Sequence, residues 1–393
     1  MQLAVTTRGL RPGFVLVGLL LVAANLRASI TSVGPVLDTV RADLGFSAMT
    51  ASVLISLPLI AFAVISPLAP PLARRIGIER SLGVALVALA ASIVLRSAPF
   101  TGAIWLGTAG LGCAIAILNV TIPALVKRDF PTRIGPVTGL YSAVQSGMAG
   151  IAAGVSVPIA GMAEHGWRVS LGLWAGLALI AFAVFAPQLR SRSRLAGPIE
   201  PVAGHRSPWR TALGWQVTLF MGLQSTGFYV LITWMPSIEQ AAGIAPATAG
   251  LHQSALNAAG LLATLGAAAL LKRSRDQRAL IAAATIMMTV SLTGLALAPS
   301  LGLLWAIAGG LGCGAAIVVA LSLFGLRTAH HDQAARLSGM AQSIGYLIAA
   351  CGPILIGALH DVTGSWASAL APMVVVLGVQ LVMGLLAGRD RVL

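Results

Sequence analysis

Long apolar runs separated by short polar segments repeat along the whole chain. Each run is continuous and long enough for a helix across the hydrocarbon core of a bilayer, which takes about 20 residues. Backbone groups in lipid must satisfy their own hydrogen bonds, so we expect every run to be helical. The pattern predicts twelve transmembrane helices, at residues 12–37, 48–72, 80–97, 102–125, 137–160, 168–188, 212–236, 247–271, 279–298, 302–326, 337–359 and 367–387.

The composition agrees with an integral membrane protein. Of the 393 residues, 57% are hydrophobic and only 9% are charged, which is more apolar side chain than a soluble core of this size needs. The 44 glycines suit close packing of helices in lipid. The three cysteines fall inside apolar runs, so we interpret them as small packing residues and expect no disulfide.

The basic residues predict the topology. The formal net charge is +14, and 21 of the 25 Lys and Arg residues fall in alternate loops or at the termini. An excess of Lys and Arg marks the cytoplasmic side, so we expect both termini in the cytoplasm. This placement explains the basic charge without a nucleic acid partner. The four exceptions are Arg27, Arg41, Arg96 and Arg168.

The chain divides into two similar halves. Residues 190–211, rich in Arg, Ser, Pro and Gly, form a predicted cytoplasmic linker between residues 1–189 and residues 212–393. Pro35 and Pro236 match at the outer ends of the first and seventh spans, and the sequence Gly-Leu-Gly-Cys recurs in the fourth and tenth spans. Two parallel six-helix repeats are typical of major facilitator transporters, which hold their substrate between the halves near the middle of the membrane.

A charged residue lies in the middle of the first apolar run. Arg27 is about 15 residues from the start of that run, close to the bilayer midplane at a rise of about 1.5 Å per residue. A guanidinium at that depth costs at least about 2.5–3.5 kcal/mol, so such a residue indicates a functional site. The run therefore predicts that something in the protein or its substrate compensates this charge.

The acidic residues offer Arg27 no partner. All eleven Asp and Glu residues fall in loops or at the ends of the predicted spans. A buried cation without a carboxylate needs water, polar side chains or a bound anion. We favour a small anionic substrate held bidentately by the guanidinium, which matches carboxylate geometry. The alternative is that carbonyls and amides hold Arg27, which then only locks helices together.

Further candidate residues surround Arg27 on the predicted helices. Thr31 lies on the same face of the first helix, whereas Asn25 lies on the opposite stripe and is as well explained by helix packing. Alignment of the two prolines places Phe228 at the position equivalent to Arg27 in the second half. The remaining candidates are polar residues within spans, each with interhelical hydrogen bonding as the alternative: Tyr141, Gln145, Gln224, Asn257, Gln342 and Tyr346.

Of the histidines, only His252 lies inside a predicted span. Its ordinary pKa near about 6.5 makes it the candidate for proton coupling, with simple hydrogen bonding as the alternative.

Two stretches carry a resemblance to a known family. The run Ala24-Asn25-Leu26-Arg27-Ala28-Ser29-Ile30-Thr31-Ser32-Val33-Gly34-Pro35-Val36-Leu37 resembles the first helix of the cyanate permease and 2-nitroimidazole transporter family, a branch of the major facilitator superfamily. The segment 70–77 resembles the superfamily's loop between spans two and three, with Arg74 where many members carry an aspartate. The resemblance implies an all-α integral membrane fold of two pseudo-symmetric six-helix bundles. It also implies a monomer in the bacterial cytoplasmic membrane, with the candidate helices bordering a central cavity.

Together these features predict a secondary active transporter. We expect it to move a small anion, an organic carboxylate or a cyanate-like ion, by alternating access with Arg27 as the anion anchor. The alternative is efflux of neutral drug-like compounds such as nitroimidazoles. The sequence contains no metal-ligand cluster, nucleophile elbow, phosphate loop or carboxylate pair, so we expect neither an enzyme nor a cofactor.

Overall fold

The computed structural model describes residues 12–100, 102–130, 132–190, 207–271, 276–329 and 331–392, which form helices and no strands. Twelve helical segments are long and apolar enough to cross a membrane, which confirms the twelve predicted spans. The predicted linker lies mostly outside the described residues, and only its ends, 190 and 207–211, fall within them.

The first half of the chain forms one bundle. Its helices are α1 (Pro12–Thr31), α2 (Leu37–Leu44), α3 (Ala48–Ile65), α4 (Ala69–Ile76), α5 (Ile78–Arg96), α6 (Ala103–Asp129), α7 (Ile134–Ala160), α8 (Gly166–Gly172) and α9 (Trp174–Phe185). The second half forms the other bundle, with α10 (Ala212–Ala241), α11 (Pro246–Leu271), α12 (Arg278–Leu297), α13 (Gly302–Leu326), α14 (His331–Thr363), α15 (Trp366–Leu370) and α16 (Pro372–Ala387).

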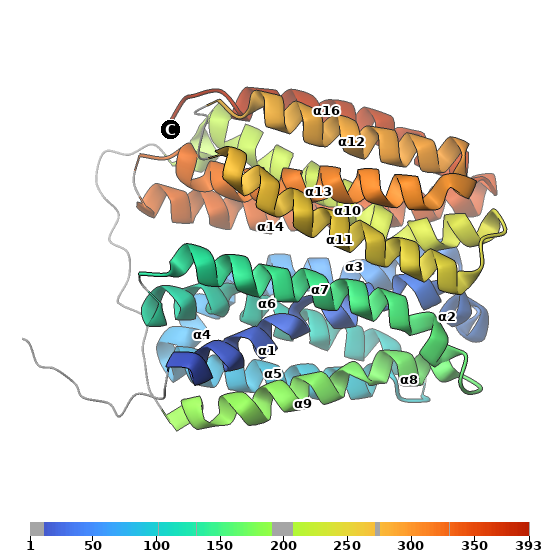
Figure 1. Ribbon diagram of the computed structural model, residues 1–393, viewed down its shortest axis with the longest axis horizontal. Helices are drawn as coiled ribbons and strands as arrows, with labels where there is room; N and C mark the ends of the chain where they lie inside the picture. Colours follow the sequence, from blue (N-terminus) through green and yellow to red (C-terminus); the bar gives the residue numbers. More distant parts are fainter. Residues whose placement is uncertain are drawn as a thin grey trace, which may run out of the picture.

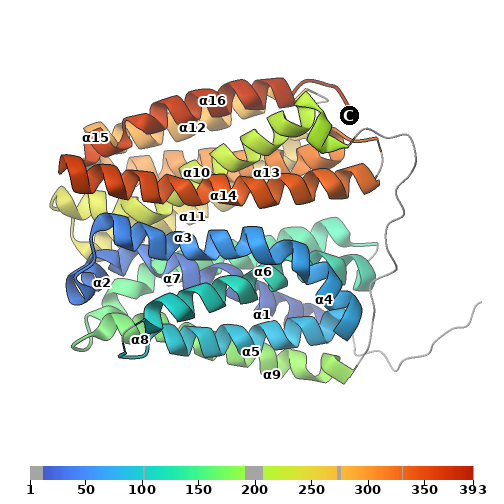
Figure 2. The same cartoon turned by 180° about the vertical axis from the view of Figure 1, so that it is seen from behind.

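The two bundles lie side by side with their helices roughly parallel (Figure 1). The start of α1 and the end of α16 lie at the same end of the molecule, which we call the terminal end, and α2 and α8 lie at the opposite, far end. Helices α3 and α14 pack against each other across the interface, and so do α7 and α11 (Figure 2). These two pairs of helices therefore connect the bundles.

The first predicted span is not one straight helix. Helix α1 ends at Thr31, a 3₁₀ turn follows at Gly34–Val36, and α2 continues to Leu44, beyond the predicted end at residue 37. Pro35 explains the break, because its ring nitrogen cannot donate a helical hydrogen bond. The backbone N–H of Val33 bonds to the carbonyl of Ile30 at 3.3 Å, which leaves the carbonyl of Ser29 for another donor.

Arg96 supplies that donor. Its guanidinium is almost fully buried, donates to the carbonyl of Ser29 at 2.8 Å and donates to the carbonyl of Leu171 at 3.2 Å. One arginine thus ties the end of α1 to α5 and α8. This contact positions the broken end of the helix that carries Arg27.

Four described hydrogen bonds cross between the bundles, and each lies between the level of Arg27 and the far end. The Ser254 hydroxyl donates to the Gly150 carbonyl at 2.7 Å, and the Ser56 hydroxyl donates to the Ala350 carbonyl at 2.9 Å. Asp361, in the last turn of α14, accepts from the backbone N–H groups of Ala48 at 2.9 Å and Met49 at 2.7 Å. These contacts close the far end.

The Asp361 contact is expected to hold the far end shut. A carboxylate at the start of α3 accepts from two free N–H groups and interacts favourably with the positive end of the helix dipole. The amide of Asp361→Asn carries no charge and has one acceptor oxygen. We expect this variant to weaken closure by about 1.5–3 kcal/mol, the contribution of a hydrogen bond to a charged group. Met162 and Ala242 are exposed at the far end, one on each bundle. Double electron–electron resonance between spin labels at these two positions should then show a population with a longer distance between the labels.

The matched control is Asp390→Asn, which removes one exposed carboxylate at the terminal end. It should keep the wild-type distance distribution. An unchanged distribution in Asp361→Asn would show that this carboxylate does not hold the bundles together.

Candidate functional site

Two adjoining cavities lie between the bundles, and both are lined by Arg27, Tyr229 and Tyr346. With the space that opens to solvent included, the larger measures about 610 Å³ and the smaller about 380 Å³. On α11 the larger cavity runs from Asn257 to Thr264, which lies about 10 Å nearer the terminal end at about 1.5 Å per residue. The cavity thus extends away from the closed far end.

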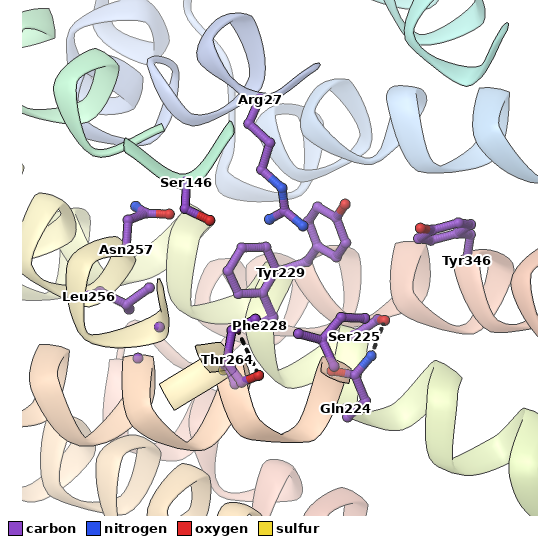
Figure 3. Close-up of a pocket in the computed structure, with 15 residues that line it drawn as sticks. Arg27, Ser146, Gln224, Ser225, Phe228, Tyr229, Leu256, Asn257, Thr264 and Tyr346 are labelled. Atoms are coloured by element: carbon purple, nitrogen blue, oxygen red, sulfur yellow. Dashed lines mark hydrogen bonds between the residues drawn. The ribbon is translucent and has the colours of Figure 1, made fainter. Parts of the chain in front are cut away.

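Arg27 projects from α1 across this space toward the rings of Phe228 and Tyr229 (Figure 3). Its guanidinium carbon lies 4.9 Å from the centroid of the Phe228 ring, a cation–π distance. Within the described residues the guanidinium has no carboxylate partner and donates no hydrogen bond to another protein group. The cation is half-buried and faces a cavity. The face of the Phe228 ring and the water or ligand in the cavity are what compensate its charge.

Several residues that the sequence singled out share these cavities with Arg27. Gln224, Phe228 and Asn257 line the larger cavity, and Thr31 and Gln145 line the smaller. The predicted residue Tyr346 lines both and meets the ring of Phe62 edge-on at 5.5 Å. Six polar or aromatic residues from α1, α7, α10, α11 and α14 thus share the two cavities with the cation.

Hydrogen bonds already engage some of these side chains. The Gln224 amide donates to the Ser225 hydroxyl at 2.7 Å, and the Asn257 amide donates to the Gln253 carbonyl at 2.9 Å. The Thr31 hydroxyl lies 3.0 Å from the carbonyl of Arg27 and 3.1 Å from that of Ala149. Thr31 therefore joins α1 to α7, whereas the amide oxygens of Gln224 and Asn257 accept no hydrogen bond from a described residue.

Three of the predicted substrate-binding residues lie outside both cavities. The Asn25 amide donates to the carbonyls of Leu21 at 2.8 Å and Leu177 at 3.4 Å, so it joins α1 to α9. The Gln342 amide donates to the Ser338 hydroxyl of its own helix at 2.7 Å. Tyr141 packs against the hydrophobic core. These three residues do not belong to the candidate site, because their side chains engage a neighbouring helix, their own helix or the core.

The expected distribution of acidic residues needs one correction. Helix α10 continues to Ala241, although the pattern predicts an end at residue 236, because Pro236 is accommodated inside the helix. Glu239 is consequently fully buried, and both of its carboxylate oxygens lie 3.1 Å from Nδ1 of His252. His252 is therefore paired at the far end and lines neither cavity. Among the described residues, no acidic side chain lines either cavity.

Other lining residues carry little signal in the sequence. Ser225 precedes the predicted position Phe228 by three residues, on the same face of α10. Cys313, which we interpret above as a packing residue, and Gly310 belong to the repeated Gly-Leu-Gly-Cys sequence, and both line the larger cavity. These two residues are three positions apart and so lie on the same face of the helix, which is the feature of the sequence that could have indicated that both line a cavity.

Comparison with known proteins agrees with this architecture. The model of the Major Facilitator Superfamily matches residues 19–275. An uncharacterized transporter of Bacillus subtilis is 43% identical over 383 residues, covering 96% of this chain and 94% of the relative. The 2-nitroimidazole transporter of Escherichia coli is 40% identical over 378 residues, covering 95% of each chain. The cyanate transport protein of the same organism is 29% identical over 356 residues, covering 88% of this chain and 90% of the relative.

A solved structure shows the same fold. The crystal structure of a bacterial homolog of the human lysosomal transporter Spinster, in an inward-facing and unoccupied conformation, superposes with a TM-score of 0.78 at 13% identity. The match covers 96% of this chain and 97% of that chain. The protein belongs to the major facilitator superfamily and, within it, to the cyanate permease and 2-nitroimidazole transporter family.

Proposed function

We propose that this transporter moves a small organic anion across the bacterial cytoplasmic membrane by alternating access, with Arg27 as the anion anchor. The observation that carries the proposal is an arginine that pairs with no carboxylate of the described residues and faces a cavity between the bundles. A guanidinium in that setting is best compensated by a ligand that brings its own negative charge. Its planar fork suits the two oxygens of a carboxylate.

The rest of the cavity suits an anion with an apolar body. The rings of Phe228 and Tyr229 meet at 5.3 Å and offer an aromatic wall beside the guanidinium. Gln224 and Asn257 add polar groups that would fix the orientation of the ligand. The aromatic wall beside the guanidinium favours an organic carboxylate over a triatomic ion such as cyanate, which has no apolar body to cover.

The closed far end supports alternating access. We propose that the terminal end is cytoplasmic, because the basic loops of the sequence gather there. The substrate would then exchange with the cytoplasm in the state described above, and rocking of the bundles would break the far-end contacts to expose Arg27 on the other side.

Transport of a neutral nitroimidazole is the second candidate. It is supported by the 40% identity to the 2-nitroimidazole transporter, and the aromatic wall would accept a planar heterocycle. In this case Arg27 would donate to the nitro oxygens of the compound, and the charge of the substrate would not contribute to affinity.

Thermal stabilisation of the purified protein separates these two candidates. Benzoate is tested against benzamide, which keeps the shape but not the charge, and against 2-nitroimidazole. A ligand at 100 times its dissociation constant stabilises the folded state by about 2.7 kcal/mol, so binding appears as a raised unfolding temperature. We expect a clear shift with benzoate and none with benzamide. Equal shifts with benzoate, benzamide and 2-nitroimidazole would contradict an anion anchor and support the second candidate.

A further inference from the structure

A buried acid–base pair at the far end takes no part in the proposed substrate site. Glu239 on α10 has no exposed surface, and His252 on α11 places Nδ1 3.1 Å from both carboxylate oxygens. The first residue of α13, Gly302, lies against them so closely that a Cβ there would overlap the carboxylate. Three helices thus converge on the pair and remove the carboxylate from water.

Among the residues that the structure describes, no other charged group compensates this pair. Helices α7, α13 and α16, which pack on α10 or α11, contain no charged residue, and the 3₁₀ turn at Gly34–Val36 adds none. The only charged residue of α12, Arg278, lies at the terminal end. Five titratable residues of α2 and α14 stand at the far end, namely Asp38, Arg41, Asp43, His360 and Asp361.

Those five residues have partners of their own. Arg41 pairs with Asp38 at 3.0 Å, and Asp43 pairs with an exposed histidine at 2.7 Å. Asp361 binds the start of α3, and the His360 ring stacks on Trp366 at 3.8 Å. The charge of the Glu239–His252 pair must therefore be balanced within the pair itself. One proton shared between carboxylate and imidazole makes the pair neutral, and without that proton a net negative charge would be buried.

The pair is connected directly to the contacts that close the far end. Gln253, the next residue, donates to the carbonyl of Ile232 at 2.8 Å, and both groups lie against Gly34 of the other bundle. Ser254 donates across the interface to the carbonyl of Gly150. A single turn of α11 therefore carries both His252, one member of the pair, and the closing contacts of Gln253 and Ser254.

We propose that Glu239 and His252 form a proton-binding site that must hold one proton for the far end to close. When the far end is open, water reaches the pair, and the imidazole–carboxylate pair takes one proton from solution. The neutral pair is then buried as α10, α11 and α13 come together, and the adjacent turn of α11 seals against the other bundle. The inference rests on the proposed transport function, since it links proton uptake to one step of alternating access.

The test is the pH dependence of far-end closure. It is measured on the full-length protein by double electron–electron resonance between spin labels at Met162 and Ala242. We expect the wild type to gain a longer-distance population as the pH is raised from mildly acidic to mildly alkaline. Glu239→Gln, which keeps the shape and removes the negative charge, should stay closed over the alkaline range. His252→Gln, which leaves the carboxylate without a proton carrier, should shift opening to lower pH.

His165→Gln is the matched control, because His165 pairs with Asp43 at 2.7 Å at the same end but is exposed. It should keep the wild-type pH response. A wild type without pH response, or Glu239→Gln with an unchanged one, would overturn the proposal. Stabilisation by benzoate is measured on the same samples. Loss of that signal alone would reject the anion anchor and leave the proton site intact.

Discussion

Arg27→Ala is expected to abolish transport while leaving the protein folded in the membrane. The variant removes a bidentate donor whose hydrogen bonds to a charged ligand contribute about 1.5–3 kcal/mol each. Loss of two such bonds weakens binding by about two to four orders of magnitude, since about 1.4 kcal/mol corresponds to a tenfold change. Removal of a half-buried cation that no described acidic residue pairs with should not lower the yield of folded protein.

The measurement is uptake or release of labelled benzoate by proteoliposomes, with the benzoate-induced rise in unfolding temperature as a binding readout. Arg27→Lys should restore little of either signal, because an ammonium keeps the charge but loses the planar fork. Arg391→Ala, which removes an exposed cation at the terminal end, should behave as the wild type. Transport at the wild-type rate by Arg27→Ala would contradict the assignment of the anchor.

Gly314→Ala is expected to be the most damaging single-methyl change in the second bundle. A Cβ at Gly314 would overlap the backbone of Gly260 on α11, and a Cβ at Gly310 would overlap the carbonyl of Leu256. Backbone cannot rotate away as a flexible side chain can, so the two helices must separate. Overpacking of a fixed interface costs about 1–3 kcal/mol or more, and the change also narrows the cavity that Gly314 lines.

The control lies in the same helix. A Cβ at Gly325 would meet no atom within 4 Å, so Gly325→Ala should gain the helix propensity of alanine, up to about 1 kcal/mol. We expect Gly314→Ala to lower the unfolding temperature and Gly325→Ala to raise it. The unfolding temperature is measured as the loss of the monodisperse peak in size-exclusion chromatography after heating. A neutral effect of Gly314→Ala would show that α11 and α13 can shift apart without loss of stability.

The pattern of apolar runs predicted most of the architecture. A membrane span must be long, apolar and helical, so the twelve helices follow from hydropathy alone, and the repeated halves predict the paired bundles. A charged residue in the middle of a span also stands out in the sequence. Moving its charge into the membrane costs free energy, whichever helices pack beside it. Arg27 could therefore be singled out before its surroundings were known.

The direction of each polar side chain was decided only by tertiary packing. Asn25 and Arg27 both lie in the polar stretch of α1, yet Asn25 bonds to α9 and Arg27 faces the cavity. Glu239 comes three residues after a proline that predicted a helix end, and its burial depends on α11 and α13 packing over it. Hydropathy reports how much of a segment is apolar, and so the sequence by itself determined the spans and the unusual cation. Which helices meet around a given side chain depends on contacts between residues far apart in the chain, and so only the tertiary structure decided which groups share the cavity and which are paired elsewhere.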